Sequence, residues 1–239
     1  AEIEGKSLLI GAARLLEREK IDASPLAAAA TRLAEDGKTP VLVAFDGAPA
    51  GVLAIEDPVK PGAADAVAAL RAMGKEVAMV TGDTAATAGA IARRLGIETI
   101  RAELLPRGKV KAVEDLRSHG PVAFVGDGIN DAPALAAADV GIAMGSGTDV
   151  ALGAAEVVLG SSSPAAVATA IALSRATMRN IRQNLFWAFG YNVVLIPVAA
   201  GALWVPFGVQ LSPMLAAFAM AMSSTFVLTN ALRLRRFRP

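Results

Sequence analysis

The chain has no cysteine and only one histidine among its 239 residues. Without cysteine it can build neither a disulfide framework nor a thiolate metal site. A net charge of +1 gives no reason to expect nucleic acid as a partner. The first residues contain neither a starting methionine nor the apolar core of a signal peptide, so we expect the chain to begin partway through a longer protein.

The sequence Gly126-Asp127-Gly128-Ile129-Asn130-Asp131 follows an apolar run, Val122 to Val125. A short apolar run that ends at glycine predicts a buried strand, and open α/β sheets bind ligands at the carboxyl ends of their strands. Asp127 and Asp131 would share one crevice with Asn130, where two carboxylates repel unless a cation holds them. Hard oxygen ligands at a phosphate site predict Mg²⁺. The alternative is a simple turn followed by a helix N-cap.

Two further loops carry polar groups of a related kind. A second apolar strand ends at Thr81-Gly82-Asp83, and Lys109 follows Pro106 near the expected start of a helix. A hydroxyl, an ammonium and a carboxylate pair on successive loops form a set suited to phosphoryl transfer. The hydroxyl and the ammonium would hold phosphoryl oxygens, and the carboxylates would hold the metal that neutralises developing charge.

Helices and strands alternate from Gly62 to about residue 158, which predicts a doubly wound parallel sheet of the α/β class. The expected helices are 62–73, 84–95, 107–118, 131–137 and 147–153. The expected strands are 76–80, 98–101, 121–125, 139–143 and 156–158.

Residues 1–54 predict a smaller α/β piece, which Glu56 to Pro61, with two prolines, separates from the alternating region. Its expected strands are 8–10, 41–45 and 51–55, and its expected helices are 12–20 and 25–37. The last two strands are joined by Asp46 to Ala50, which predicts a hairpin. We therefore interpret Asp46 as a turn residue and not as a nucleophile.

The last part of the chain is strongly apolar. Leu185 to Leu203 and Met214 to Leu232 contain no charged residue, and each is about long enough to span a bilayer. A helix from Pro164 to Ala176 leads toward them. Arginines flank both outer ends and none lies in the connection, so the positive-inside rule predicts a cell-membrane hairpin with both ends in the cytoplasm. The alternative is a buried pair of core helices.

Polar residues inside a membrane span are functional candidates by default. Tyr191 and Asn192 lie in the first expected span, and Met220 and Ser224 share one face of the second. A thioether is a soft ligand that favours Cu(I) over harder ions. The alternatives are an interface aromatic for Tyr191, a helix–helix hydrogen bond for Asn192, and packing for the other two.

Four segments together resemble the phosphorylation domain of the P-type ion-pumping ATPases, which belongs to the haloacid-dehalogenase-like superfamily. They are Thr81 to Asp83, Pro106 to Lys109, Gly126 to Leu135 and Gly141 to Asp149. The resemblance implies that Thr81 and Lys109 contact the phosphoryl group and that Asp127 and Asp131 surround Mg²⁺.

The resemblance also implies three parts: residues 1–54 as the end of a nucleotide-binding domain, 55–165 as the phosphorylation domain, and 166–239 as the last two membrane helices and a tail. ATP would then be a cofactor, with Asp57 at the hinge and Gly5 and Gly11 near the nucleotide. Isolated glycines such as Gly5 and Gly11 are more often structural turns than nucleotide contacts, and a turn is the alternative for both.

The membrane residues sharpen the resemblance to one branch of this family. Tyr191-Asn192 and Met220-x-x-Ser223-Ser224 resemble the last two membrane helices of the copper(I)-transporting P-type ATPases. This implies the C-terminal part of a Cu(I) exporter, whose partners would be the rest of the pump, the lipid membrane and a copper chaperone. The family's phosphorylated Asp-Lys-Thr-Gly-Thr segment is absent from the chain. We therefore expect the chain to be inactive alone.

Three alternatives to this function stay open. A membrane-anchored phosphatase of the same superfamily would need its own nucleophilic aspartate beside the Thr81 loop. A non-catalytic regulatory fragment would bind the full pump without turnover. A pump for silver or another soft ion would use the same ligands.

Overall fold

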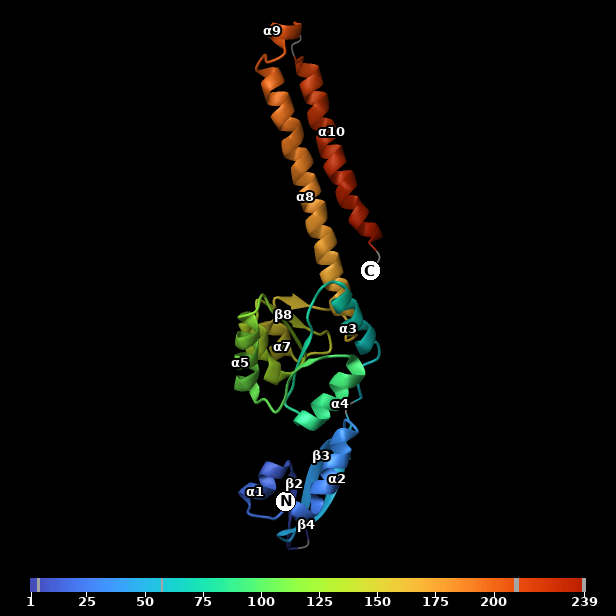
Figure 1. The fold of residues 1–239 in the computed structure, drawn as a ribbon. Coiled ribbons are helices and arrows are strands. Elements are labelled where there is room, and N and C mark those ends of the chain that lie inside the picture. The colour runs from blue at the N-terminus through green and yellow to red at the C-terminus, as the bar shows by residue number, and fades with distance from the viewer. Residues whose placement is uncertain (4, 57, 209–210, 238–239) are drawn as a thin grey trace. The chain divides into compact units, whose positions relative to one another are not determined.

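The computed structural model describes residues 1–3, 5–56, 58–208 and 211–237 (Figure 1). Asp57, one of the predicted hinge residues, therefore lies outside the described residues. The chain divides into two compact units, Ala1–Ala168 and Thr169–Pro239, and each is described by itself below.

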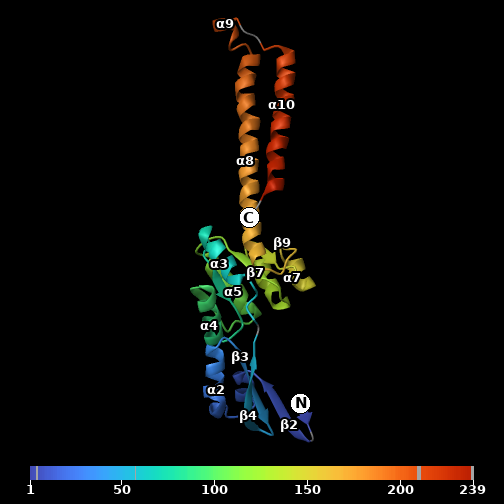
Figure 2. The same cartoon turned by 90° about the vertical axis from the view of Figure 1, so that its right-hand side faces the viewer.

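The first unit begins with a four-stranded antiparallel sheet in the order β1-β2-β3-β4 (Figure 2). Helices α1 and α2 pack on this sheet and close a small core made by Leu16, Ile21, Leu42 and Ala44. The elements are β1 (Glu2–Ile3), β2 (Lys6–Gly11), α1 (Ala13–Arg18), α2 (Ser24–Glu35), β3 (Thr39–Phe45) and β4 (Ala48–Ile55).

The hairpin between β3 and β4 is tighter than the five-residue connection expected from the sequence. Ala48 already pairs with Phe45, so only Asp46 and Gly47 form the turn. Both have positive φ, 52° and 78°, as a two-residue hairpin turn of the common type requires. The conformation explains the Asp-Gly pair as a turn and supports the interpretation that Asp46 is not a nucleophile.

Helices and strands alternate through the rest of this unit as predicted, with bounds within two residues of those expected in most cases. They are α3 (Ala63–Ala72), β5 (Ala78–Val80), α4 (Ala85–Leu95), β6 (Thr99–Arg101), α5 (Pro106–Arg117), β7 (Ala123–Gly126), η1 (Ile129–Asp131), α6 (Ala132–Ala137), β8 (Val140–Ala143), α7 (Asp149–Ala154) and β9 (Val157–Val158). The strand pairs of this region are parallel, as predicted. They form two sheets, β5–β6 and β7–β8–β9, instead of one.

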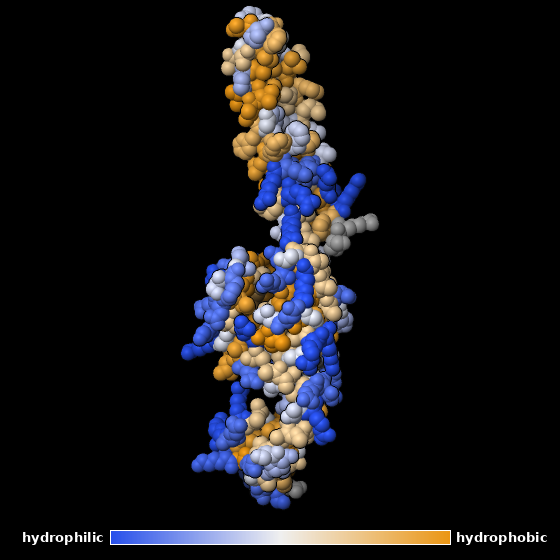
Figure 3. All heavy atoms as spheres, in the orientation of Figure 1, coloured by the Kyte–Doolittle hydropathy of each residue, from blue (hydrophilic) through white to orange (hydrophobic). Residues whose placement is uncertain are grey.

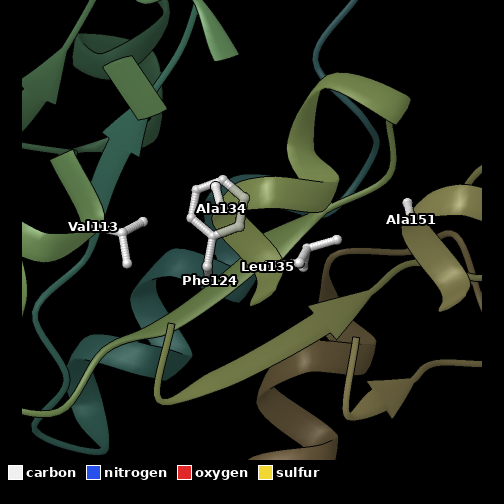
Figure 4. Packing of buried hydrophobic residues seen from close by; sticks show 5 residues of the cluster. All are labelled: Val113, Phe124, Ala134, Leu135 and Ala151. Atoms are coloured by element: carbon white, nitrogen blue, oxygen red, sulfur yellow. The ribbon is translucent and has the colours of Figure 1, made fainter. Parts of the chain in front are cut away.

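One hydrophobic core serves the helices around β7 (Figure 4). Phe124 of β7 packs with Val113 of α5, with Ala134 and Leu135 of α6, and with Ala151 of α7. Val80 at the end of β5 packs against the same cluster. Both short parallel sheets therefore contribute to one core, which positions the loops that follow β5 and β7.

The second unit is built mainly from two long helices. The elements after β9 are α8 (Ala165–Ala199), α9 (Trp204–Phe207), α10 (Pro213–Leu232) and η2 (Arg233–Arg236). The expected helix 164–176 and the expected span 185–203 are thus one continuous helix. The end expected at Leu203 was wrong, because Gly201, with a φ of 92°, stops the helix one turn earlier.

Helices α8 and α10 lie side by side in both views (Figures 1 and 2), and the rings of Trp187 and Phe226 meet between them with centroids 5.3 Å apart. Among the described residues, one helix is long and apolar enough to cross a membrane, Pro213–Arg236. The mostly apolar part of α8 that follows Gln183 and Asn184, Leu185 to Ala199, is shorter than the about 18 apolar residues that identify a span. The second predicted span is thus supported more directly than the first.

Candidate functional site

Asp131 and Lys109 form the most buried ion pair of the described chain. The Lys109 ammonium lies 2.7 Å from Asp131 Oδ1, and the side chains are 15 % and 14 % exposed. The Gly128 N–H donates to Asp131 Oδ2 at 3.2 Å. The carboxylate is therefore held at both oxygens, as a poorly solvated charge must be.

Glycine at position 126 is a steric requirement of this arrangement. A Cβ added to Gly126 would lie 2.7 Å from the Cβ of Asp131, closer than real side chains approach. The loop after β8 forms two hydrogen bonds to the C-terminal end of β7. The Thr148 N–H donates to the Asp127 carbonyl at 3.0 Å, and the Met144 N–H donates to the Gly126 carbonyl at 3.1 Å. The C-terminal end of β7 is thus held in place by the loop that follows β8.

Asp127 pairs with a lysine that sequence reasoning missed. The Lys60 ammonium donates to Asp127 Oδ2 at 2.8 Å, and both side chains are about half exposed, at 45 % and 46 %. The signal that could have found Lys60 is a single cation between two prolines, Pro58 and Pro61, just before the alternating region. Each carboxylate of the predicted pair therefore has its own lysine.

The polar groups of the Thr81 loop form hydrogen bonds within the loop. The Thr81 hydroxyl donates to Asp83 Oδ2 at 2.8 Å and accepts from the Asp83 N–H at 3.1 Å. The Leu104 N–H donates to the Thr81 carbonyl at 3.1 Å, and a Cβ at Gly82 would lie 3.2 Å from the Leu104 carbonyl. Among the described residues, no hydrogen bond or ion pair joins this loop to Asp127 or Asp131.

The donor set at the end of β7 fits Mg²⁺. Proteins usually bind this ion through one or two carboxylates, with waters and substrate phosphates completing the shell. Asp127 and Asp131 supply two carboxylates, and the exposed Asn130 lies between them in the sequence. Within the described part of the chain, no group of three or more His, Asp or Glu side chains could hold a metal ion, and Mg²⁺ binding by Asp127, Asp131 and Asn130 stays a prediction.

Gly5 and Gly11, which were predicted near the nucleotide, each have a structural explanation within their own segment. Gly5, with a φ of 75°, lies in the connection between β1 and β2. A Cβ at Gly11 would lie 2.5 Å from the Cδ2 of Leu15. Nucleotide contact by Gly5, Gly11 and Asp57 stays a prediction.

Among the described residues, no hydrogen bond joins the candidate copper ligands of α8 to those of α10. Tyr191 is half-buried, whereas Asn192 is exposed and donates to the Ala188 carbonyl of its own helix at 2.7 Å. Met220 is 66 % exposed, and the exposed Ser224 donates to the Met220 carbonyl at 3.4 Å. The neutral polar groups of Asn192 and Ser224 are therefore satisfied locally while their side chains face outward.

Two family models of the same description, haloacid dehalogenase-like hydrolase, match the chain over residues 2–139 and 109–171. The chain belongs to the haloacid dehalogenase-like hydrolases, and the predicted fold class is confirmed.

Within that family, the chain is 56 % identical over 238 residues to Copper-transporting ATPase 1 of Rhizobium meliloti (strain 1021), covering 99 % of this chain and 29 % of that protein. It is 49 % identical over 238 residues to the silver exporting P-type ATPase of Salmonella typhimurium, with the same coverage. A crystal structure of a zinc-transporting PIB-type ATPase in its E2.Pi state matches with a TM-score of 0.73 and 40 % identity, covering 98 % of this chain and 37 % of that chain.

The resemblance to the metal-transporting P-type ATPases is thus confirmed along nearly the whole sequence. The chain spans about three-tenths of the length of the curated relatives it matches.

Proposed function

We propose that this chain is the C-terminal part of a P-type ATPase that exports Cu(I) from the cytoplasm. The observation that carries the proposal is the pair of lysine-compensated carboxylates after β7, in a chain 56 % identical to a copper-transporting relative. Since the chain spans about three-tenths of such relatives, its first partner is the remainder of the pump. ATP and Mg²⁺ are the cofactors, and copper is the cargo.

Lys109 is suited to bind a phosphoryl group without leaving Asp131. Its ammonium has three N–H donors, and one is directed to Asp131 Oδ1. The other donors could hold phosphoryl oxygens, and Asp127 and Asp131 would hold Mg²⁺ through lone pairs that their bonds to the lysines and to the Gly128 N–H leave unused. The ion supplies positive charge where negative charge develops during phosphoryl transfer.

The Thr81 hydroxyl has to change partner to serve the same group. It now donates to Asp83, and a hydroxyl has only one proton to donate. Binding of a phosphoryl oxygen by Thr81 therefore releases Asp83 Oδ2. The backbone of the loop can stay fixed, because the Thr81 carbonyl and N–H are bonded to Leu104 and Arg101.

The phosphoryl acceptor comes from the rest of the protein, because the chain has no Asp-Lys-Thr-Gly-Thr segment and Asp46 forms a hairpin turn. In the described part, β5 pairs only with β6, and β7 pairs only with β8. Each therefore has an edge free to pair with a strand from upstream. Such a strand would bring its own C-terminal end beside the loops of Thr81 and Asp127, where an aspartate could attack the γ-phosphoryl group of ATP.

In the membrane, Tyr191, Asn192, Met220 and Ser224 form this chain's share of the Cu(I) site. The thioether of Met220 is the one soft ligand among them. Both helices cross the bilayer as a hairpin with the two ends of the chain in the cytoplasm, since arginines lie only at the outer ends of the apolar stretches. Ag(I), also a soft ion, would be accepted by the same groups, and a copper chaperone would deliver the ion.

The test compares the 239-residue chain with the intact pump. Purified chain in detergent with Mg·ATP should release phosphate at the level of a control without protein, because no acceptor is present. The intact pump should release phosphate when Cu(I) is added. Turnover by the chain alone that Asp46→Asn abolishes would show a membrane-anchored phosphatase instead. An intact pump stimulated by Zn²⁺ but not by Cu(I) would refute the ion assignment.

A further inference from the structure

A cluster of amide side chains joins α8 and α10 close to one end of the hairpin. Asn180 Nδ2 donates to the Asn230 carbonyl at 2.7 Å, and Asn230 Nδ2 donates to Asn184 Oδ1 at 2.9 Å. Asn184 Nδ2 in turn donates to Asn180 Oδ1 at 3.1 Å. Asn180 and Asn230 are 8 % and 6 % exposed. This amide cluster fixes which residues of the two helices lie at the same level.

Arginines surround the amide cluster, and we call them the arginine collar. Arg179 and Arg182 precede Asn180 and Gln183 on α8, and Arg233 donates to Asn230 Oδ1 at 3.3 Å. All members are exposed: Arg179, Arg182, Arg233, Arg235 and Arg236. Figure 3 shows a hydrophilic band at this end of the helices, next to their apolar part. The amide bonds thus bring guanidinium groups of both helices to one level.

The collar has no carboxylate of its own to neutralise it. After Glu156 the sequence contains no aspartate, glutamate or lysine, while it contains seven arginines. In the described part, Arg182 and Arg236 make no hydrogen bond or ion pair. Several uncompensated like charges held at one level repel one another, so the arrangement favours an anionic partner.

The chemistry of the partner follows from the guanidinium group and from its neighbours. Guanidinium is planar and binds two oxygens of a phosphate at once, which lysine cannot do. One to two turns along the helices from the collar, large apolar side chains are exposed, with Phe186 at 69 %, Trp187 at 51 % and Phe226 at 46 %. A ligand with a phosphate joined to hydrocarbon chains matches both surfaces together.

We propose that the arginine collar binds the phosphate headgroups of anionic phospholipids, and that the amide cluster positions the arginines of α8 and of η2 for this. One headgroup contacted by Arg182 and Arg236 would then tie α8 to η2, which directly follows α10. The proposal rests on the membrane hairpin of the proposed function, and it adds a lipid site that the transport reaction does not itself require.

The test uses Trp187 as a reporter, five positions along α8 from Arg182. The variant Trp204→Phe leaves Trp187 as the only tryptophan of the chain. It is reconstituted in phosphatidylcholine bilayers that contain increasing fractions of brominated phosphatidylglycerol or of brominated phosphatidylcholine, and quenching is recorded. The matched control, Trp187→Phe, leaves Trp204 of α9, in a connection without arginine.

We expect brominated phosphatidylglycerol to quench Trp187 at a lower fraction than brominated phosphatidylcholine does, and Trp204 to show no preference. Arg182→Gln and Arg236→Gln should each reduce the preference about fivefold. Equal quenching of Trp187 by both lipids, or a preference unchanged in the double variant, would overturn the proposal. So would loss of the preference in millimolar inorganic phosphate, because the ligand would then be free phosphate.

Two further outcomes separate this proposal from the proposed function. If neither brominated lipid quenches Trp187, the hairpin does not lie in the bilayer and the proposed membrane function fails as well. In the intact pump, native mass spectrometry should detect anionic phospholipid retained in detergent, and less of it in the Arg182→Gln, Arg236→Gln variant. No difference between the two would mean that another part of the pump covers the collar, and would also overturn the proposal.

Discussion

The end of β7 and the helix pair α8–α10 carry two candidate sites that differ in how complete they are. At the end of β7, both carboxylates already touch their lysines, at 2.7 and 2.8 Å. On the helix pair, Met220, Asn192 and Ser224 are exposed, and the side chains of Asn192 and Ser224 donate to backbone carbonyls of their own helices, those of Ala188 and Met220. One site is organised within this chain, whereas the other would be completed by groups from outside it.

The difference follows from charge. A carboxylate shielded from water needs a compensating cation, because the cost of burying an unpaired charge is several kcal/mol. The folded unit that shields Asp131 from water therefore has to supply its cation, and Lys109 is that cation. A thioether loses little in hydrocarbon, and amides and hydroxyls can bond to the carbonyl four residues earlier in their own helix. Neutral ligand groups can therefore be stable without a partner ligand, whereas a buried carboxylate needs its cation within the same folded unit.

The largest effect expected is that of Asp131→Asn in the intact pump. The neutral amide weakens the Mg²⁺ site, so formation of the phosphoenzyme from ATP should fall more than about 100-fold. Cu(I) binding should change little, since the ligands are in the other unit. Acid-stable phosphoenzyme and copper retention are measured on the same preparation. Normal phosphoenzyme at low Mg²⁺ would contradict the assignment of Asp131.

The next effect tests the membrane half of the comparison. Met220→Leu preserves volume and should leave expression and insertion normal, yet it removes the soft ligand. Copper-stimulated phosphate release should fall about 10-fold or more. Met222→Leu is the matched control, because two positions turn a side chain about 200° around the helix and Met222 is similarly exposed, at 52 % against 66 %.

The two methionine variants can contradict the assignment in two ways. If Met222→Leu were damaging and Met220→Leu silent, the wrong face of α10 would have been assigned to copper. If both were silent, the copper site would lie elsewhere.

A third prediction concerns the close packing that makes the β7 site complete. Gly126→Ala places a methyl group 2.7 Å from the Cβ of Asp131 and should destabilise the first unit by about 1–3 kcal/mol. Gly153→Ala is the control: Gly153 lies in helix α7, has nothing within 4 Å of its added Cβ, and should gain about 0.5–1 kcal/mol. Chemical denaturation of both variants measures the difference. Equal stability of the two would show that Asp131 can move aside freely.

Local signals in the sequence account for most of the element bounds that were predicted correctly. Pro106 begins α5 and Gly96, with a φ of 71°, ends α4, because proline and glycine fix the backbone where they stand. The spacing of Asp127 and Asp131 likewise predicted that both follow one strand. These features depend only on residues close by in the sequence, so the sequence alone predicts them.

What the sequence could not predict depends on distant residues. Lys60 and Asp127 are 67 positions apart, and no local pattern pairs a linker lysine with that carboxylate. The division of the parallel strands into two sheets depends on which strands meet in space. In α10, Asn230 is one polar residue in an apolar stretch, and its role depends on contacts with Asn180 and Asn184 of the other helix, which no local pattern predicts.

The smallest effect expected is a pH dependence at Asp139, a carboxylate held by exposed groups. The Val122 N–H, at 2.9 Å, and the Arg117 guanidinium, at 2.7 Å, lower the pKa of Asp139 below its ordinary value of 3.8. Because the folded state has the lower pKa, the stabilisation is fully present above the unfolded pKa and is lost as pH falls through the folded one. Asp139→Asn lacks this titration.

The temperature of unfolding of the parent chain should therefore exceed that of Asp139→Asn at neutral pH, and the gap should narrow as the pH is lowered through about 4 and below. Glu114→Gln, an exposed position on the same helix as Arg117, is the control and should show no such gap. A gap that stays constant between neutral pH and pH about 3 would mean that Asp139 acts through its shape and hydrogen bonds alone. Asp131 and Asp139 would then differ in how they stabilise the fold. The buried Asp131 would depend on its ion pair with Lys109, whereas the exposed Asp139 would act through its hydrogen bonds without a contribution from its charge.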